Sequence, residues 1–305
     1  MTVRLPYLWI CREVAVNWIG YKLRVRRLFR RKRNNNVHFD VDTDVREKGY
    51  ERLSFIKDSL RSLLGDEEFL SYWPPRRVVE MGPGGTLVLG LLLISEGVEE
   101  YMGIDEFPSD VLGAYPRECY RRLFEELSNR PPVEAAFAES VSSDSGPIRY
   151  YGTEGIGAFR RIASGSVDLI FSWGCLEHVL DPLNVFKESK SLLSPAGIAI
   201  HTISTHGHTW RPLKHLIVPD WLWSVMYWRR GFINRFMPRQ YIEWARKADY
   251  HVTEIGREYE DAQVALYKPA MLARYQNESD AELRTAELML ALRSHLLRVD
   301  TDSPD

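Results

Sequence analysis

Two carboxylates and a glycine-rich turn are the residues whose types and spacing most clearly suggest chemistry. In the stretch VVEMGPGGTL, residues 78–87, an apolar run ends at Glu80 and the chain then turns through Gly82, Pro83 and Gly84. Glycines in such a turn let a ligand approach the backbone without a Cβ clash. A second acid, Asp105, stands 23 residues after Gly82, at the end of the next apolar segment. Acids at both places predict a ligand that carries hydroxyl groups and positive charge.

The charge of Glu80 separates the ligands that use glycine-rich turns. A nicotinamide dinucleotide is typical of G-x-G-x-x-G, but Leu87 stands at the third glycine position and Glu80 would repel the pyrophosphate. A phosphate-binding P-loop is excluded because no G-K-[ST] follows. S-adenosylmethionine carries a sulfonium and an ammonium but no phosphate, so both acids suit it. Asp105 could accept hydrogen bonds from both ribose hydroxyls.

Alternating strand and helix patterns must position these residues. Short apolar runs predict strands at 77–81, 100–107, 148–152, 166–173 and 197–204. Helical spacing or buried apolar composition predicts helices at 44–70, 86–97 and 109–129, and from the fourth strand to Leu193. This alternation predicts an α/β sheet, largely parallel, with helices on both faces. Ligands of such sheets bind outside the carboxyl ends of the strands.

These motifs, in this order, resemble class I S-adenosylmethionine-dependent methyltransferases. The segments VVEMGPGGTL, GIDEF and SVDLIFSWGCLEHVLDPLNVFKESKSLLSPAGIAI are similar to the type 11 group, which is marked by D-L-I-x-S-x-x-x-L-E-H-V. The likeness covers roughly residues 76–204, with a looser echo at 239–255. It implies a Rossmann-like sheet of seven mostly parallel strands whose last strand is antiparallel. The candidate for that strand, 284–294, is equally consistent with a helix from its leucine spacing.

The resemblance also implies roles for residues at the strand ends. The glycine turn would surround the methionine part of S-adenosylmethionine, and Asp105 would hold the ribose. Residues after the third strand fall where the adenine edge is held, and the end of the fourth strand lies beside the methionine tail and the reacting methyl group. The expected cofactor-binding residues are therefore Glu80, Gly82, Pro83, Gly84, Asp105, Thr153, Glu154, Ser172 and Trp173.

Histidines after the fourth and fifth strands are the candidates for catalysis. Four of them fall within HTISTHGHTWRPLKH, residues 201–215. Histidine titrates near neutrality and could take a proton from a hydroxyl as it attacks the methyl carbon. This favours an oxygen acceptor, although a loop with incidental histidines is an open alternative. The candidate bases are His201, His206 and His208, and His178 is a further catalytic candidate.

The pair Glu177 and His178 also raises the question of a metal. In some quinone-precursor O-methyltransferases such a pair joins a third carboxylate, but Gly174 stands at that position. Two protein ligands are few for a hard cation, which prefers about six or more oxygen ligands. We therefore expect this pair to serve packing or substrate positioning, and we expect no metal.

Two segments outside the sheet pattern have a distinct composition. The insertion at 206–238 contains six aromatic residues between 217 and 238, which predicts a lid over the acceptor or a helix packed on the core or on another subunit. Arg229, Arg230 and Arg235 could bind an anionic group of the acceptor or face water.

Residues 22–33 hold eight Lys or Arg and no acid. This arm could lie on an anionic membrane, grip an anionic partner or form a solvated helix.

Bulk composition limits the function classes. With 305 residues and 45% hydrophobic content, the chain can bury a sizeable core. The net charge of −2 gives no reason to expect nucleic acid. Three scattered cysteines predict reduced thiols in the cytoplasm, and no apolar run is long enough to predict a transmembrane helix.

We therefore expect a basic arm and linker at 1–44, followed by a methyltransferase domain at 45–305. The predicted function is O-methylation of a small-molecule, natural-product or sugar acceptor. The alternatives are a lipid-linked or isoprenoid acceptor at a membrane surface and a cofactor-binding module without transfer activity. Peripheral membrane contact through residues 1–33 and a homodimer are two assemblies that the sequence leaves open.

Overall fold

The computed structural model describes residue 11 and residues 40–107, 109–127, 146–206, 213–226, 233–260 and 263–294. The predictions for the basic arm at 22–33, for His208 and for residues 227–232 of the aromatic insertion lie outside these ranges. Within them, no helix combines the length and hydropathy needed to cross a bilayer.

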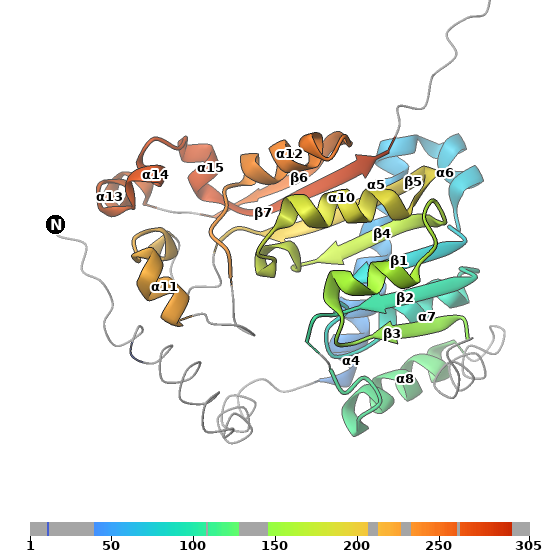
Figure 1. Ribbon diagram of the computed structural model, residues 1–305. Helices are drawn as coiled ribbons and strands as arrows, with labels where there is room; N and C mark the ends of the chain where they lie inside the picture. The colour runs from blue at the N-terminus through green and yellow to red at the C-terminus, as the bar shows by residue number, and fades with distance from the viewer. Residues whose placement is uncertain are drawn as a thin grey trace, which may run out of the picture.

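The described strands form one sheet in the order β3-β2-β1-β4-β5-β7-β6 (Figure 1). Strands β1 to β5 pair in parallel, and β7 runs antiparallel to both β5 and β6. The predicted seven-stranded, mostly parallel fold is confirmed. The strands are β1 Arg77–Met81, β2 Glu100–Ile104, β3 Ile148–Tyr151, β4 Val167–Trp173, β5 Leu193–Ser204, β6 His251–Tyr259 and β7 Thr285–Arg293.

Helices cover both faces of the sheet, as predicted. One core layer lies between the sheet and α5, α7 and α8, and a second lies between the sheet and η3, α10 and α12. Helix α7 is buried along most of its length because it is apolar on every side. The bounds are α5 Arg52–Leu64, α7 Val88–Ser95, α8 Ala114–Glu126, the 3-10 helix η3 Gly155–Arg161, α10 Pro182–Leu192 and α12 Pro238–Lys247.

The predicted helix at 44–70 is divided into shorter elements. It comprises α4 Val41–Val45, a π-helical turn η2 at Arg46–Glu51, α5, and α6 Asp66–Tyr72. Gly65, with a φ of 80°, separates α5 from α6. At Gly49 in the π-turn, a Cβ atom would lie 2.7 Å from Cγ1 of Val88. The absence of a side chain there lets this segment pack closely on α7.

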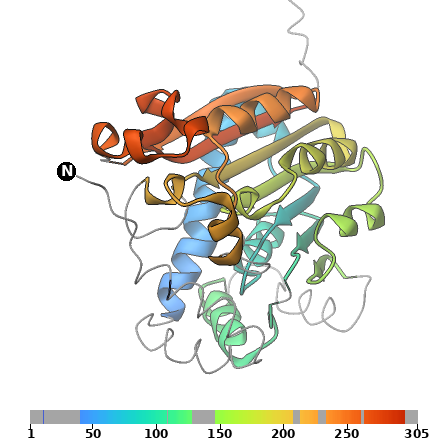
Figure 2. The same cartoon turned by 60° about the vertical axis from the view of Figure 1, so that its left-hand side comes forward.

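The aromatic insertion is one half of a two-part structure at the carboxyl edge of the parallel strands. Its described elements, η5 Lys214–Leu216 and α11 Asp220–Met226, are followed by the second half, α13 Val264–Tyr267, η7 Lys268–Ala270, α14 Ala273–Gln276 and α15 Asp280–Arg284. Figures 1 and 2 both show the two halves next to each other at one end of the sheet. We call residues 213–226, 233–237 and 263–284 the cap. The sequence prediction included only its first half.

The two halves of the cap share an apolar core and an ion-pair network. Leu213, Leu216 and Met237 pack with Val264, Met271, Tyr275 and Leu283. Asp220 accepts hydrogen bonds from Arg235 and, at 2.5 and 2.7 Å, from Arg274. Arg235 is 8% exposed and also donates to the carbonyls of His215 and Val218. It therefore neither faces water nor is placed to bind an acceptor, in contrast to the sequence expectation.

Candidate functional site

A hollow of about 250 Å³ lies where β1, β2 and β4 end. Its walls come from the glycine turn after β1, the acids after β2, the start of η3 and the turn after β4. This is the position at which open α/β sheets bind ligands. The lining residues are Met81, Gly82, Ile104, Asp105, Glu106, Phe107, Gly155, Ile156, Phe159, Gly174, Cys175, His178 and Val179.

The glycine turn needs its glycines for two different reasons. Gly82 and Gly84 have φ angles of 72° and 76°, in the left-handed region that side chains disfavour. A Cβ atom at Gly82 would lie 3.1 Å from Sγ of Cys175, whereas one at Gly84 would meet nothing within 4 Å. Gly82 thus lies where the glycine turn packs against the turn after β4. Gly84 faces open space where a ligand could approach the backbone. Pro83 packs toward Gly103 of β2.

Asp105 lies at the end of β2 and lines the hollow, as the sequence predicted. Its Oδ1 accepts the N–H of Phe107 at 3.0 Å, and its backbone carbonyl accepts the N–H of Gly155 at 3.1 Å. Burial raises the pKa of Asp105, although N–H groups of Phe107, Gly84 and Glu106 oppose that rise. The carboxylate is therefore held in place at the junction of the β2 and β3 loops.

Glu80, which was expected to contact the cofactor, lies buried on β1. It is 1% exposed, and its two carboxylate oxygens accept hydrogen bonds from Arg52 at 3.2 Å and Tyr101 at 2.6 Å. Burial raises the pKa of Glu80, and Arg52 opposes that rise. Glu80 does not line the hollow described above.

Arg52 is a candidate site residue that the sequence analysis did not name. It lies at the start of α5, directly after the π-turn, and its guanidinium carbon is 5.6 Å from the ring centroid of Trp173. Its side chain is 15% exposed. The only sequence signal is an arginine next to the apolar stripe that starts at Leu53. That signal does not identify its partner, because Glu80 is 28 residues away.

The pKa of the Cys175 thiol is affected by the acids near the hollow. Burial raises the pKa of its thiol strongly, and the carboxylates of Glu177, Asp105, Glu106 and Glu80 raise it further. Carboxylates from three separate loops and strands thus act on one sulfur atom. Two of these carboxylates, Asp105 and Glu106, line the hollow, and carboxylates at a binding site disfavour a phosphate ester and favour a cationic ligand.

Comparison with known proteins agrees with this geometry. The model of the family Methyltransf_23, described as a methyltransferase domain, matches residues 25–255. The chain belongs to this methyltransferase family. It is an S-adenosylmethionine-dependent enzyme of the class I fold.

Two solved structures show a distant likeness to this methyltransferase. An S-adenosylmethionine-dependent methyltransferase from Mesorhizobium loti is 16% identical, with 75% of this chain and 98% of that chain covered and a TM-score of 0.43. Phosphoethanolamine N-methyltransferase 2 from Haemonchus contortus, solved with S-adenosyl-L-methionine, is 14% identical, with 79% and 57% covered and a TM-score of 0.41. Likenesses this distant say nothing about the acceptor. No curated protein matches the sequence.

On acidification, donor binding by the methyltransferase should weaken at a higher pH than the ordinary pKa of a carboxyl group would predict. Burial raises the pKa of both Glu80 and Asp105, so on acidification each takes up a proton at a higher pH than usual. Protonated Glu80 would no longer attract a cation, and protonated Asp105 would accept hydrogen bonds less well. We expect calorimetric affinity for S-adenosylhomocysteine to be constant near pH 8 and to begin to fall above pH ~4, the ordinary carboxyl range. An affinity that stays constant down to that range would contradict the assignment.

The residues predicted after β3 do not line the methyltransferase hollow. Thr153 is exposed, and Glu154 pairs with Arg161, with 2.8 Å between Oε1 and Nη2. The next residues, Gly155 and Ile156, line the hollow together with Phe159. In this segment the residues that line the hollow therefore begin at Gly155, two positions after Thr153.

The two residues predicted at the end of β4 have different positions. Ser172 is fully buried, and its Oγ lies 2.8 Å from Nδ1 of His201, so its side chain points into the core. Trp173 packs edge-on against Phe55 at 5.3 Å and lies near Arg52. Only Trp173 directs its side chain to the edge where Arg52 and Glu80 meet.

The candidate bases lie in different environments in the fold. His201 is fully buried against Phe186, and burial lowers its pKa to about 3, so it has no route to an acceptor and we do not retain it as a base. His178 lines the hollow. His206 follows β5 and is half-buried, with Nδ1 2.9 Å from Oγ of Ser204. Among the described residues, no cluster of three or more His, Cys, Asp or Glu could hold a metal.

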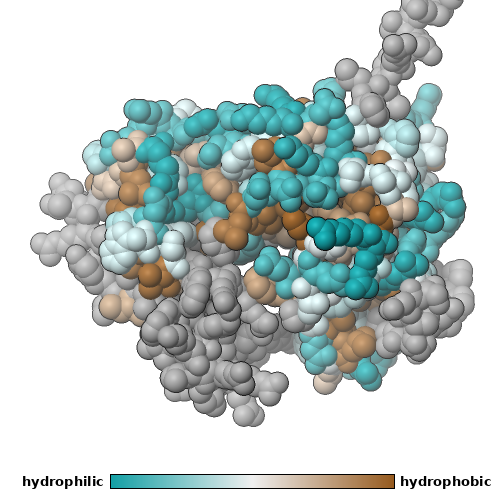
Figure 3. Space-filling model, viewed as in Figure 1, coloured by the Kyte–Doolittle hydropathy of each residue, from teal (hydrophilic) through white to brown (hydrophobic). Residues whose placement is uncertain are grey.

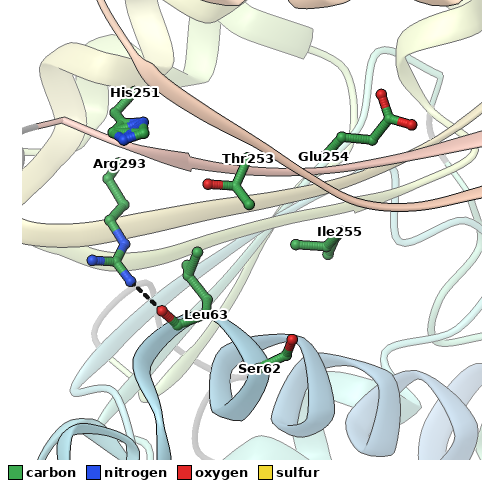
Figure 4. Close-up of a pocket in the computed structure, with 7 residues that line it drawn as sticks. All are labelled: Ser62, Leu63, His251, Thr253, Glu254, Ile255 and Arg293. Atoms are coloured by element: carbon green, nitrogen blue, oxygen red, sulfur yellow. Dashed lines mark hydrogen bonds between the residues drawn. The ribbon is translucent and has the colours of Figure 1, made fainter.

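A second and larger hollow, of about 410 Å³, lies between the end of α5 and β6 (Figure 4). Arg293 points into it and donates to the carbonyl of Leu63 at 2.6 Å. That bond satisfies one of the last carbonyls of α5, which have no partner within the helix. Glu254 points away from Arg293 in Figure 4 and pairs with Arg257. We therefore assign Arg293 to helix capping.

Proposed function

We propose that the enzyme transfers a methyl group to an oxygen of a small-molecule acceptor bound between the hollow and the cap. The hollow would hold the adenosine of the donor, with Asp105 on the ribose. Residues Arg52, Glu80 and Trp173 would surround the methionine part. The observation that carries this placement is that two carboxylates, Asp105 and Glu106, line the hollow beside Gly82 of the glycine turn, which suits a donor that carries hydroxyl groups and positive charge.

Further features of the structure fit the donor. The open space over Gly84 would admit a ligand against the backbone. The hydroxyl of Thr86, next to the turn, is buried without a hydrogen-bond partner. Arg52 and Glu80 form a pair of opposite charges, which suits an amino acid that carries both a carboxylate and an ammonium.

The mechanism that we propose needs little from the protein beyond alignment. When bound, the donor supplies an electrophilic methyl group on a sulfonium, which is a good leaving group. The protein aligns the acceptor oxygen with that methyl group and excludes water. His206 or His178 would take the proton of the hydroxyl as the oxygen attacks. The Ser204 contact orients the His206 ring at the end of β5.

An isotope-labelled donor assay tests this function. Extracts of the source organism are incubated with the enzyme and labelled S-adenosylmethionine, and the product is identified by mass spectrometry. We expect label on an oxygen of a small molecule. Label on nitrogen or carbon would reject O-methylation.

Three histidine variants test the base. Of His206→Ala, His178→Ala and His208→Ala, the one that removes the base should lower turnover with little change in donor affinity. If all three variants keep full turnover, the proposed base is wrong.

The role proposed for Arg52 predicts a selective loss of affinity. Arg52→Met should raise the Kd for S-adenosylhomocysteine about ten-fold or more, since a hydrogen bond to a charged group contributes about 1.5–3 kcal/mol. The Kd for adenosine, which lacks the amino acid, should be unchanged. Lys48→Met is a suitable control, because Lys48 lies one turn earlier and pairs with Asp44 at 2.6 Å. Equal losses for both ligands would argue against the role.

A membrane-associated acceptor is the second candidate, and the surface of α11 favours it. Trp221 is 69% exposed and Val225, one turn later, is 38% exposed. Figure 3 shows apolar side chains gathered at the position of α11. Sedimentation with anionic liposomes would compare the full chain, a chain lacking residues 1–33, and Trp221→Ser. Binding that falls in both variants would support this candidate; no sedimentation of the full chain would exclude it.

A further inference from the structure

Asn234, in the last part of the cap, binds the turn that follows β4. Its side-chain Nδ2 donates to the carbonyls of Leu176 at 2.9 Å and Val179 at 3.0 Å. Its backbone N–H donates to the carbonyl of Glu177 at 2.7 Å. The three carbonyls belong to the 3-10 turn η4, Leu176–His178, and to the residue after it. One residue thus binds almost the whole turn.

The turn forms one wall of the hollow that we assign to the donor. Cys175, His178 and Val179 all line it. Inside the turn, two backbone hydrogen bonds are formed, from His178 to Cys175 at 2.9 Å and from Val179 to Leu176 at 3.2 Å. Such short 3-10 segments have poor hydrogen-bond geometry. Bonds from outside the turn are therefore important for its shape.

Asn234 is held in turn by the cap and by α12. Its Oδ1 accepts the hydroxyl of Tyr241 at 2.7 Å. The carbonyl of the preceding residue, Ile233, accepts Nε1 of Trp223 at 2.7 Å, and the following residue, Arg235, donates to the carbonyl of His215. With Asn234 only 7% exposed, its position follows from the packing of the cap.

We propose that Asn234 is a positioning residue through which the cap sets the shape of the donor site. This inference rests on the proposed placement of the donor in the hollow. The Asn234 amide bridges two carbonyls and holds His178 and Val179 against the bound ligand. Loss of the two bonds from the Asn234 amide to the turn is thereby transmitted to donor affinity, although Asn234 does not line the hollow.

Calorimetry with S-adenosylhomocysteine and with adenosine tests this role. Asn234→Ala removes two hydrogen bonds to the turn, each of about 1 kcal/mol, so we expect the Kd of both ligands to rise about ten-fold. Both should be affected because the wall faces the adenosine part. Asn234→Ser, which keeps one polar group, should have a smaller effect and provides a second variant if Asn234→Ala does not fold. Hydrogen exchange at the amides of His178 and Val179 should become faster in both variants.

Two control variants separate positioning from general stability. Tyr241→Phe removes the bond to Oδ1 but leaves both donors, and Tyr275→Phe removes the 2.9 Å bond from Tyr275 to the carbonyl of Arg235 within the cap. Both should keep the ligand Kd within about two-fold of wild type. If Asn234→Ala lowers the melting temperature but leaves Kd unchanged, the inference is overturned. If Asp105→Ala also leaves Kd unchanged, the donor site itself is misplaced.

Discussion

Replacing Asp105 with alanine should weaken donor binding by about two orders of magnitude. In the proposed site its two oxygens accept hydrogen bonds from both ribose hydroxyls. Hydrogen bonds to a charged group contribute about 1.5–3 kcal/mol each, so the loss of two corresponds to about 100-fold or more in Kd. The effect should be large because Asp105 is held at the junction of two loops by the N–H of Phe107 and the N–H of Gly155. Calorimetry with S-adenosylhomocysteine measures it directly.

Asp110→Ala is the matched control for this prediction. Asp110 is an exposed carboxylate five residues later and does not line the hollow. The control should leave donor affinity unchanged, and adenosine should show the same loss as S-adenosylhomocysteine in Asp105→Ala, because both ligands carry the ribose. A loss of less than about three-fold in Asp105→Ala would show that this acid does not bind the ribose.

Gly82→Ala should have the largest effect on the fold of the site. The methyl group would lie 3.1 Å from Sγ and 3.2 Å from Cβ of Cys175, in a backbone conformation with a φ of 72°. The left-handed backbone costs about 1–2 kcal/mol for a residue with a side chain, and overpacking adds about 1–3 kcal/mol. Because Cys175 lines the hollow, relief of the clash must also move the turn after β4. Denaturant unfolding and calorimetry should therefore both show a loss.

Gly84→Ala separates the two causes of that loss. Its φ of 76° is nearly the same, but its Cβ would meet nothing within 4 Å. The free energy of unfolding should fall only by the backbone cost of about 1–2 kcal/mol, while donor affinity should fall because the methyl group occupies the space over the turn. Equal stability losses in the two variants would show that the contact with Cys175 is unimportant.

The structure changes the prediction of an aromatic lid. The predicted aromatic lid is half of a cap whose other half comes from residues 263–284, between β6 and β7. Trp223 is buried inside the cap, and Phe236 packs on Tyr241 and Trp244 of α12. These described aromatic residues build the cap rather than line a wall for the acceptor.

The sequence alone determined the features that depend on local patterns. Strand runs that end in glycines or acids lie at one edge of a parallel sheet wherever they occur, so Gly82, Gly84 and Asp105 could be placed without coordinates. The preference for a cationic nucleoside followed from the charges near the turn. The donor class and the fold were accessible for this reason, and the enzyme family followed from the resemblance of the ordered motifs to known methyltransferases.

Tertiary structure decided the features that depend on partners far along the chain. The segment 284–294 suited helix and strand equally, and antiparallel pairing with both β5 and β6 made it a strand. Strand alternation and packing turned Ser172 and His201 into the core, which a motif cannot reveal. The contacts of Arg52 with Glu80 and of Asn234 with Leu176 span 28 and 58 residues. Hydrogen bonds across such separations form only when the whole sheet and cap have assembled, so no local pattern in the sequence encodes them.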